Sequence, residues 1–298
     1  MQSIAWDDIR AFVAVAHAGQ IGSASKALGQ DATTTGRKIR RLEQCLGITV
    51  FERTRNGQVL TEAGEELLVR AEAMARAAQD IGDVSSPGAG LAGTLRISVS
   101  EGFGSQFLSR HLGRFARAHP NLVVDLVANS GFLNPSKREA DLAVMLSRPR
   151  TGPVLCRKLA DYRLRLYASA QYIAENGSIE TISALGNGHT LIGYVPDLVY
   201  APELNFLDEF GFAMTAHIRS SSINAQHRLI AEGAGIGALP CFIADRDPSL
   251  RAICPDQWIV RSFWIVTHRE TQNLARVKLA KEWLLESVQL GRGQLMPS

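Results

Sequence analysis

The sequence predicts an α+β multidomain protein that consists of an N-terminal winged helix-turn-helix, one long helix and a C-terminal two-lobed α/β domain. Three observations support this prediction. Residues 6–61 contain three short helical patterns and a hairpin signal, and residues 62–83 form one long helical pattern. From residue 94 onwards, strand and helix patterns alternate. With 298 residues, the chain is long enough for two or three domains that each have a core.

Residues 31–46 predict an amphipathic helix that presents cations on its outer face. Asp31 suits the N-cap, where its carboxylate accepts from the free N–H groups of the first turn. The side chains that recur at the spacing of an inner face are Ala32, Thr35, Ile39, Leu42 and Leu46. The opposite face carries Thr33, Arg37 and Arg40, flanked by Thr34 and Arg41. Such a helix fits the major groove of DNA, and a solvated surface helix is the alternative interpretation.

The residues before this helix complete a helix-turn-helix. A first helix is expected over residues 7–18, and the sequence Gly19-Gln20-Ile21-Gly22 is expected to break it. A short second helix is expected over residues 23–28, with its small apolar side chains turned inward. Gly29 and Gln30 then form the tight turn into the cationic helix. Three short helices with a glycine-containing turn between the last two are typical of this motif.

A basic hairpin is expected directly after the helix-turn-helix. Asn56-Gly57 lies between two alternating runs within residues 48–60, which is the strongest short signal for a hairpin. Arg53 and Arg55 lie beside the turn. The hairpin is therefore predicted to be a wing that follows the phosphate backbone of DNA.

The order and spacing of these residues resemble the winged helix-turn-helix of LysR-type transcriptional regulators over residues 6–64. One stretch departs from the family, which usually begins its recognition helix with Ser-Gln-x-Ala-Val/Leu-Ser, whereas this chain has Asp31-Ala-Thr-Thr-Thr-Gly36. Gly36 costs a helix on the order of 1 kcal/mol relative to Ala, but it allows a close approach of the backbone to DNA. The matching segments are Asp8–Ala16, Ala24–Leu28, Arg37–Glu43, Leu46–Gly47, Val50–Arg53 and Leu60–Gly64.

The net charge of +3 is concentrated in the N-terminal module. Residues 1–60 contain eight Lys or Arg residues and five acidic ones, whereas the rest of the chain has 24 of each. This placement is expected if only the N-terminal module meets a polyanion. The four cysteines are far apart and form no Cys-x-x-Cys pair, so we expect reduced thiols in a cytoplasmic protein. The sequence shows neither a signal-peptide pattern nor a run of 18 apolar residues, which predicts no membrane partner.

Residues 62–83 predict one helix of roughly 33 Å at 1.5 Å per residue. Thr61 suits its N-cap. A weak coiled-coil seam predicts that a second copy of the chain covers this helix, and packing on its own chain is the alternative. In the family this element is the dimerising linker helix. The seam consists of Leu67, Ala71, Met74, Ala78 and Ile81.

The C-terminal part resembles the family's effector domain, which is built like periplasmic binding proteins. Its first strands and helices follow a β-α-β-α-β order, which predicts a parallel sheet, and the chain is expected to cross between lobes near residues 159–163 and 262–267. Family phrases recur at Ala140–Ala143, Leu166–Ser169 and Ala234–Pro240. The strands are expected at 94–98, 122–128, 141–146, 154–159, 163–168, 189–194, 217–219, 236–239 and 258–268, and the helices at 103–119, 137–139, 170–175, 222–232 and 271–288.

These patterns predict the following domain boundaries. The winged helix-turn-helix is expected at 1–61, the linker helix at 62–84, a hinge at 85–93 and the effector-binding domain at 94–290. Lobe I of that domain is expected at 94–161 and 265–290, and lobe II at 162–264.

Polar residues that follow the predicted strands are candidates for effector binding, because open α/β sheets bind ligands beyond the carboxyl ends of their strands. A helix N-terminus at that place also offers free N–H groups to an anion. The alternative is that these serines only cap helices. The candidates are Ser98, Ser100, Glu101, Asn129, Ser130, Ser147 and Ser221.

No motif predicts a cofactor or a metal. Gly233-Ala-Gly-Ile-Gly237 follows a helix and enters a strand, whereas a dinucleotide-binding glycine loop needs the reverse order. The seven histidines form no metal-binding spacing, and neither a P-loop nor a nucleophile elbow occurs. The sequence therefore predicts that the protein is not an enzyme and has no catalytic or metal-binding residues.

Thr33, Thr34 and Arg37 are predicted to reach base edges, and Lys38, Arg40, Arg41, Arg53 and Arg55 to neutralise phosphates. The resemblance implies a regulator that binds a dyad-symmetric site on double-stranded DNA. It further implies control by a small-molecule effector, contact with RNA polymerase in an activator, and homodimers that pair into homotetramers. Two alternatives are a small-molecule carrier with no regulatory role, for which the wing arginines have no use, and an enzyme that has acquired a helix-turn-helix.

Overall fold

The computed structural model describes residues 4–55, 57–84, 91–129, 131, 139–186, 188–210 and 216–297. The chain divides into two compact units, residues 1–89 and residues 90–298. None of the helices in the described ranges is long and apolar enough to cross a membrane.

Three short helices form the core of the N-terminal unit. Phe12 and Val15 of the first helix and Ala24 of the second are fully buried, and Leu42 of the third packs with them. Gly29 adopts a φ of 65° in the turn between the second and third helices, which confirms the predicted tight turn. The second helix begins at Ile21, so the predicted break is shorter than expected. The three helices are α1 (Trp6–Ala18), α2 (Ile21–Ala27) and α3 (Ala32–Leu46).

The predicted wing is a two-stranded antiparallel hairpin of β1 (Phe51–Thr54) and β2 (Gly57–Leu60). Phe51 packs its ring 5.3 Å from that of Phe12, and Gln58 N donates to Gly19 O at 2.7 Å. A side chain at Gly57 would meet the same Gly19 carbonyl, so glycine is needed where the wing contacts the α1–α2 turn. The expected turn residue Asn56 lies outside the described residues.

The long helix α4 (Glu62–Val84) is attached to its own unit over its first half. Thr61 Oγ1 accepts from Gly64 N at 3.0 Å, which caps the helix as expected. Ala71 is fully buried and Leu67 packs against the core of the unit, whereas Met74 is 48% exposed. The first residues of the predicted seam therefore pack on their own chain, which was the alternative interpretation. The side chain of Ile81 lies outside the described part.

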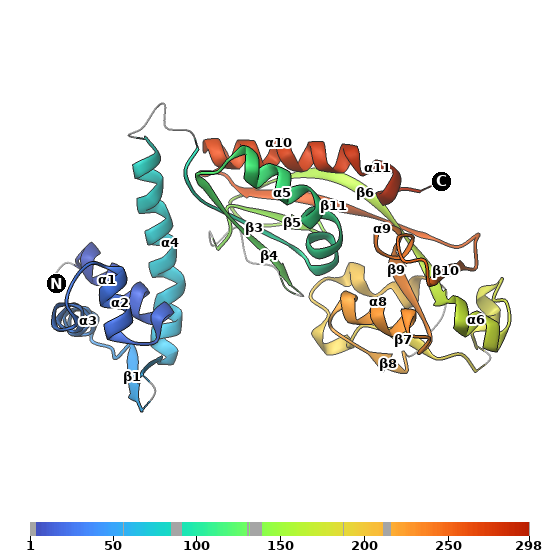
Figure 1. The fold of residues 1–298 in the computed structure, drawn as a ribbon, viewed down its shortest axis with the longest axis horizontal. Coiled ribbons are helices and arrows are strands. Elements are labelled where there is room, and N and C mark those ends of the chain that lie inside the picture. Colours follow the sequence, from blue (N-terminus) through green and yellow to red (C-terminus); the bar gives the residue numbers. More distant parts are fainter. Residues whose placement is uncertain are drawn as a thin grey trace. The chain divides into compact units, whose positions relative to one another are not determined.

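A nine-stranded mixed sheet is the centre of the C-terminal unit (Figure 1). β3 pairs in parallel with both β4 and β5, which confirms the predicted parallel arrangement. The residues expected to form strands at 154–159 and 163–168 form one strand, β6, and β10 was not predicted. The strand order is β4-β3-β5-β11-β6-β9-β7-β8, and β10 pairs with β6. The strands are β3 (Gly93–Ser100), β4 (Leu122–Asn129), β5 (Leu142–Met145), β6 (Val154–Ser169), β7 (Leu191–Gly193), β8 (Ile218–Arg219), β9 (Ile236–Pro240), β10 (Leu250–Ile253) and β11 (Ile259–His268).

The long strands β6 and β11 connect two lobes, as Figure 1 shows. Lobe I contains β3, β4 and β5 with α5 and α10, and lobe II contains β7, β8 and β9 with α6 and α8. Of the helical piece expected at residues 137–139, residues 137 and 138 lie outside the described residues, and Glu139 is not helical. Besides the π-helix η1 (Phe103–Leu108), the helices are α5 (Ser109–Ala118), α6 (Ala170–Asn176), α7 (Phe206–Glu209), α8 (Ile223–Ala231), α9 (Cys241–Ala244), α10 (Ala275–Leu290), α11 (Arg292–Leu295) and the 3-10 helices η3 (Ile182–Gly186), η4 (Pro196–Leu198) and η5 (Pro202–Leu204).

The helix expected over residues 103–119 begins with the π-helical turn η1. Gly104 faces the sheet there, and a side chain at this position would come within 2.5 Å of Ala128 Cβ and 2.6 Å of Val99 Cγ2. Glycine thus lets this turn lie directly against β3 and β4. This turn follows directly after the carboxyl end of β3.

A buried ion pair holds α10 on lobe I. Arg276 Nη2 donates to Asp141 Oδ1 at 3.0 Å, and the other carboxylate oxygen accepts from Arg96 N at 2.9 Å. Arg276 is 5% exposed and Asp141 9%. Removing one partner of such a pair leaves the other charge buried without compensation.

We expect Arg276→Met to lower the free energy of unfolding by about 3–5 kcal/mol, because Asp141 would keep its charge without its cation. The matched control is Arg228→Met on α8, whose exposed pair with Glu232 at 2.8 Å is worth at most about 1 kcal/mol. Denaturant unfolding followed by circular dichroism measures both. Equal losses in the two variants would contradict the structural role of Arg276.

Candidate functional site

The outer face of α3 is the first candidate site. Thr35, Ile39 and Leu42 are buried against the unit, and the predicted outer residues Thr33 and Arg37 are exposed. Arg40 is exposed as well. The helix period therefore separates an apolar inner face from a polar outer one, as the sequence predicted, except that Ala32, which was expected on the inner face, is exposed.

The start of α3 is fixed by two hydrogen-bonded groups. The Asp31 carboxylate accepts from Thr34 N and from Thr34 Oγ1, both at 2.7 Å, which confirms the predicted N-cap. The bond from the Thr34 hydroxyl is the main reason that the pKa of Asp31 is lowered. Behind the helix, Ser25 Oγ donates to Thr35 Oγ1 at 2.8 Å and holds α2 against α3. The Thr34 hydroxyl is thus already engaged, and Thr33 projects from the same turn.

The predicted cations fall into two groups. Arg41 is exposed but donates from Nε to Asp8 Oδ2 at 2.6 Å, and Asp8 is buried. Lys38 Nζ donates to Gln30 Oε1 at 2.9 Å. Within the described ranges, no ion pair or hydrogen bond engages the side chains of the other group. That group consists of Arg37, Arg40, Arg53 and Arg55.

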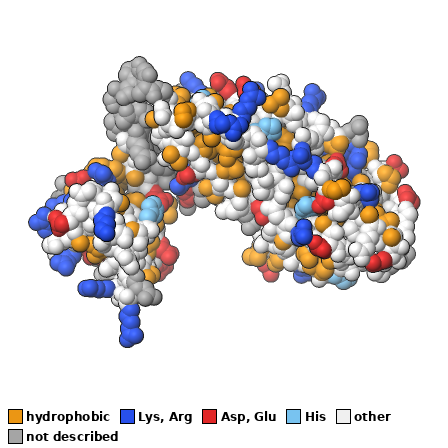
Figure 2. Space-filling model, in the orientation of Figure 1, with side chains coloured by type: hydrophobic (Ala, Val, Ile, Leu, Met, Phe, Trp, Pro, Cys, Tyr) orange, Lys and Arg blue, Asp and Glu red, His pale blue; other side chains and the backbone are white. Residues whose placement is uncertain are grey.

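The α3–wing groove has a volume of about 530 Å³ and lies between the outer face of α3 and the hairpin. Gly36 and Arg40 line it from α3, and Arg53, Arg55 and Gln58 line it from the wing. Figure 2 shows Lys and Arg side chains over α3 and at the tip of the wing. A side chain at Gly36 would meet no atom within 4 Å, so packing inside the protein does not require glycine there.

The second candidate site is the inter-lobe cavity, which lies beyond the carboxyl end of β3. Its volume is about 30 Å³, which is about the space of one water molecule. Ser100, Glu101 and Gly102 line it from lobe I, and Ser221 and Ile223 line it from lobe II. The aromatic lining residues are Phe103, Tyr162, Tyr194, Tyr200, Phe206, Phe242 and Phe263.

The carboxylate of Glu101 connects the two lobes at this cavity. Oε1 accepts from Ser222 Oγ at 2.7 Å and from Asn224 Nδ2 at 3.0 Å, and Oε2 accepts from Ile223 N at 3.0 Å. These donors lie at the N-terminus of α8, where free N–H groups favour an anion. Gln106 Nε2 adds a bond to Asn224 Oδ1 at 3.0 Å. The lobes are therefore closed on each other by a carboxylate that belongs to the chain itself.

The tyrosines around the cavity stay neutral. Burial raises the pKa of Tyr200 to about 12, and it also raises the pKa of Tyr194 and of Tyr162 well above the ordinary value of a tyrosine. The charge of Glu101 adds to the shift at Tyr194 and Tyr200. The cavity thus combines neutral aromatic rings with one carboxylate.

The structure brings three predicted candidates together at the cavity, namely Ser100, Glu101 and Ser221. Ser98 is fully buried within the sheet, and Asn129 is exposed at the end of β4 opposite Ser100. Neither these two nor Ser147, which follows β5, is among the residues that line the cavity. Ser130 lies outside the described residues.

The sequence predicted neither the aromatic walls nor Asn224, one of the lobe II partners of Glu101. The aromatic residues come from segments far apart in the sequence, and no spacing connects them. A signal did exist for Ser222 and Asn224, because a serine and an asparagine directly before and within the first turn of a predicted helix often act as polar caps.

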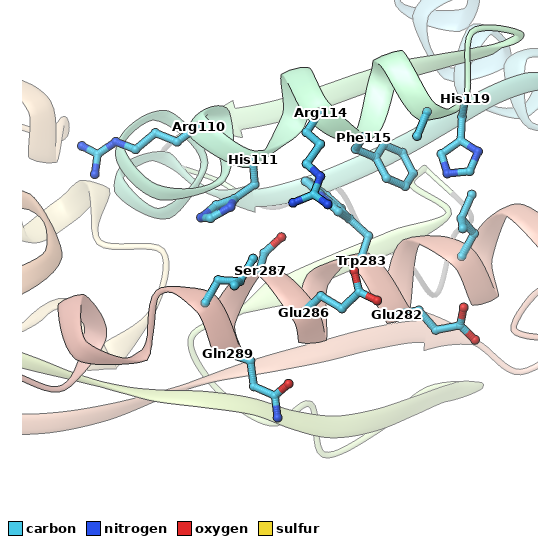
Figure 3. A pocket seen from close by; sticks show the side chains of 13 residues that line it. Arg110, His111, Arg114, Phe115, His119, Glu282, Trp283, Glu286, Ser287 and Gln289 are labelled. Carbon is cyan, nitrogen blue, oxygen red and sulfur yellow. The ribbon is translucent and has the colours of Figure 1, made fainter.

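A larger groove of about 810 Å³ lies on lobe I between α5 and α10 (Figure 3). Phe115 and Trp283 form its floor with their ring centroids 4.8 Å apart, and Arg114 and Glu286 extend from the two facing helices. The sequence analysis assigned no function to these residues.

The described residues include no group of three His, Cys, Asp or Glu side chains that could hold a metal ion. All four cysteines are free thiols, and burial raises the pKa of Cys241 to about 11. Neither the outer face of α3 nor the inter-lobe cavity therefore has the ligands of a metal centre.

Comparisons with known proteins agree with this architecture. Residues 6–65 match the model of the bacterial regulatory helix-turn-helix protein, lysR family, and residues 88–289 match that of the LysR substrate binding domain. The HTH-type transcriptional regulator CrgA of Neisseria meningitidis serogroup C is 26% identical over 250 residues, which cover 81% of each chain.

Two solved structures share the fold over nearly the whole chain. A full-length OxyR variant from Pseudomonas aeruginosa superposes with a TM-score of 0.69 at 19% identity, covering 97% of this chain and 98% of the other. Full-length CbnR in complex with its target DNA superposes with a TM-score of 0.67 at 20% identity, covering 96% and 99%. Together with the two family models, which span most of the sequence, these likenesses show that the chain belongs to the LysR family of DNA-binding transcriptional regulators.

Proposed function

We propose that this regulator reads a dyad-symmetric DNA site through the outer face of α3 and responds to a small molecule bound between its lobes. The observation that supports this most directly is the set of exposed arginines on α3 and the wing, which have no acidic partner among the described residues. Guanidinium groups left free on one face are suited to base edges and phosphates.

Within this proposal, Thr33, Thr34 and Arg37 contact bases, because they project from the first turns of α3. Arg40, Arg53 and Arg55 border the α3–wing groove and contact phosphates. Lys38 and Arg41 also contact phosphates within this proposal. Their bonds to Gln30 and Asp8 hold them in place before DNA arrives.

We propose that two copies associate through the part of α4 that its own unit leaves uncovered. Met74 is half exposed there, although Leu67 and Ala71 are already packed within the unit. Dimers then pair into tetramers, and an activating form contacts RNA polymerase.

The proposed working parts are the winged domain at 1–61, the linker helix at 62–84, the hinge at 85–93 and the effector domain at 94–290. The boundary between the two compact units falls between residues 89 and 90 of the sequence, within the proposed hinge. The relative CrgA is a transcriptional regulator. We propose that this chain likewise acts on DNA in the cytoplasm and catalyses no reaction.

The experiment that tests this proposal is selection from fragmented genomic DNA of the source organism. The purified full-length chain is incubated with the fragments at moderate salt, and the retained DNA is sequenced. We expect enrichment of one dyad-symmetric site. Retention of DNA with no preferred sequence would contradict base reading by the outer face of α3.

Arg37→Ala and Arg55→Ala should affect DNA binding in different ways. Loss of a base contact at Arg37 should reduce the affinity for the selected site by about 1–3 kcal/mol and leave random DNA nearly unchanged. Loss of a phosphate contact at Arg55 should weaken both about equally and reduce the salt slope by about 1. Fluorescence anisotropy across a salt series measures both. Equal losses on both DNAs for Arg37→Ala would exclude a base-reading role.

Gly36→Ala should move stability and DNA affinity in opposite directions. Alanine should stabilise the N-terminal unit by about 1 kcal/mol, because glycine weakens a helix and the space around Gly36 is empty. The added methyl group enters the α3–wing groove, so we expect weaker binding to the selected site. Thermal unfolding and anisotropy are measured on the same preparation, with Gly113→Ala on α5 as a helix control remote from DNA. Unchanged affinity would show that DNA does not approach Gly36 closely.

A further inference from the structure

The walls of the inter-lobe cavity carry one kind of charge. Among the described residues that line it, Glu101 is the one carboxylic acid, and none is Lys, Arg or His. A second carboxylate lies nearby, because Glu203 precedes the lining residue Leu204 and its charge reaches Tyr162. The cation Arg261 lies near as well: its charge acts on Tyr162 more strongly than that of Glu203, and its guanidinium pairs with Glu209. Glu101 is thus the one formal charge among the described lining residues, and the charges behind the wall include both signs.

Both of these carboxylates can accept further hydrogen bonds. Glu203 Oε2 is buried and has no hydrogen-bond partner among the described residues. Glu101 accepts three hydrogen bonds, whereas two carboxylate oxygens offer about four acceptor positions. Glu203 is not among the residues that line the cavity, so the acceptor capacity available to a ligand there is that of Glu101.

Aromatic rings form much of the wall of the same space. Tyr162, Phe263 and Phe103 cover part of one another's faces, because Tyr162 and Phe263 are stacked with centroids 4.2 Å apart and Phe103 lies 4.2 Å from Phe263. The lining ring of Tyr194 meets Phe206 nearly edge-on at 5.9 Å. Phe242 meets Tyr162 nearly edge-on at 5.9 Å. Aromatic faces are negative at their centres and attract an organic cation, most strongly when water is excluded.

An anionic ligand would meet two obstacles. The donors that could hold it, Ser222 Oγ, Ile223 N and Asn224 Nδ2, are already bound to Glu101. If the anion displaced Glu101 from them, that carboxylate would remain beside the ligand, and two like charges at such a distance repel each other. A cation is instead attracted by the charge of Glu101.

We propose that the inter-lobe cavity takes a small organic ammonium ion, held by the carboxylate of Glu101 and the faces of the surrounding aromatic rings. This inference rests on the proposed function, because it names the chemical class of the effector. The closed cavity has the volume of about one water molecule. A larger ammonium ion must separate the lobes, and the bonds between Glu101 and α8 are those that change when it enters.

Three probes of similar shape and different charge test the proposal on the full-length chain. Benzylammonium, benzyl alcohol and benzoate are titrated into the protein in a calorimeter at neutral pH. We expect benzylammonium to bind about tenfold or more tightly than the other two, because it alone is attracted by both the carboxylate and the ring faces. Tighter binding of benzoate or of the alcohol would overturn the proposal, and so would binding of none of the three.

Two variants assign the effect to the cavity. Glu101→Gln should lose about tenfold or more in benzylammonium affinity, and Glu175→Gln, which changes an exposed residue on α6, should bind as the unaltered chain does. If Glu101→Gln does not fold by circular dichroism, Tyr194→Leu removes one ring face and should also weaken binding. Unchanged affinity in folded Glu101→Gln, or in folded Tyr194→Leu, would overturn the proposal.

Failure of this inference can be told apart from failure of the proposed function. The affinity of the full-length chain for the selected DNA site is measured in the presence of each probe. If an anionic or neutral compound changes DNA binding, control by an effector would be supported. The inference that the effector is an ammonium ion would be overturned. Absence of any selected DNA site would count against the proposed function itself.

Discussion

The antiparallel pairing of β6 with β11 is the constraint on which the C-terminal unit depends. The pairing runs from Ile259 opposite Leu164 to His268 opposite Val154, with a shift in register between Phe263 and Trp264. Both lobes are built on this pair of strands, because β5 joins its one end and β9 joins its other. Tyr162 of β6 stacks on Phe263 of β11 at the irregularity, so the same place in the ladder forms a wall of the inter-lobe cavity. The lobes can therefore change their angle only by bending the strands that also carry the site.

The sequence predicted most of the elements whose signals are local. Helix periodicity identified α1, α3 and α4, and the glycine turn and the hairpin followed from residues next to them in the chain. The sequence did not predict the elements that depend on contacts between residues far apart in the chain. Residues 160–162 did not look like the middle of a strand, but β11 pairs along the whole stretch and makes β6 continuous. The π-helical start of the helix after β3 follows from the close approach of Gly104 to Val99 and Ala128, which no local pattern shows.

The candidate sites were predictable to different degrees for the same reason. A helix exposes one face at a regular spacing, so the outer residues of α3 could be named from the sequence alone. The ion pair of Arg41 with Asp8 joins residues 33 positions apart and could not be read from that spacing. At the inter-lobe cavity, the rule that ligands lie beyond strand ends found Ser100 and Glu101. The aromatic walls depend on how seven residues from separate parts of the sequence pack, and therefore no pattern in the sequence indicates them.

The attachment of α4 to the N-terminal unit fixes how this helix is rotated about its own axis relative to α3. Leu67 and Ala71 clamp the first half of this helix to α1, and His17 Nε2 lies 2.7 Å from Glu72 Oε1 at the same contact. A rigid helix turns by about 100° per residue, so the direction of the described side chains that follow, such as Met74 and Ala78, is fixed relative to the outer face of α3. One residue inserted after Met74 would leave the winged domain intact and turn the remainder of the helix to a different side. In the proposed dimer, the number of residues in this segment therefore determines how two copies of α3 can be matched to the turns of a DNA duplex.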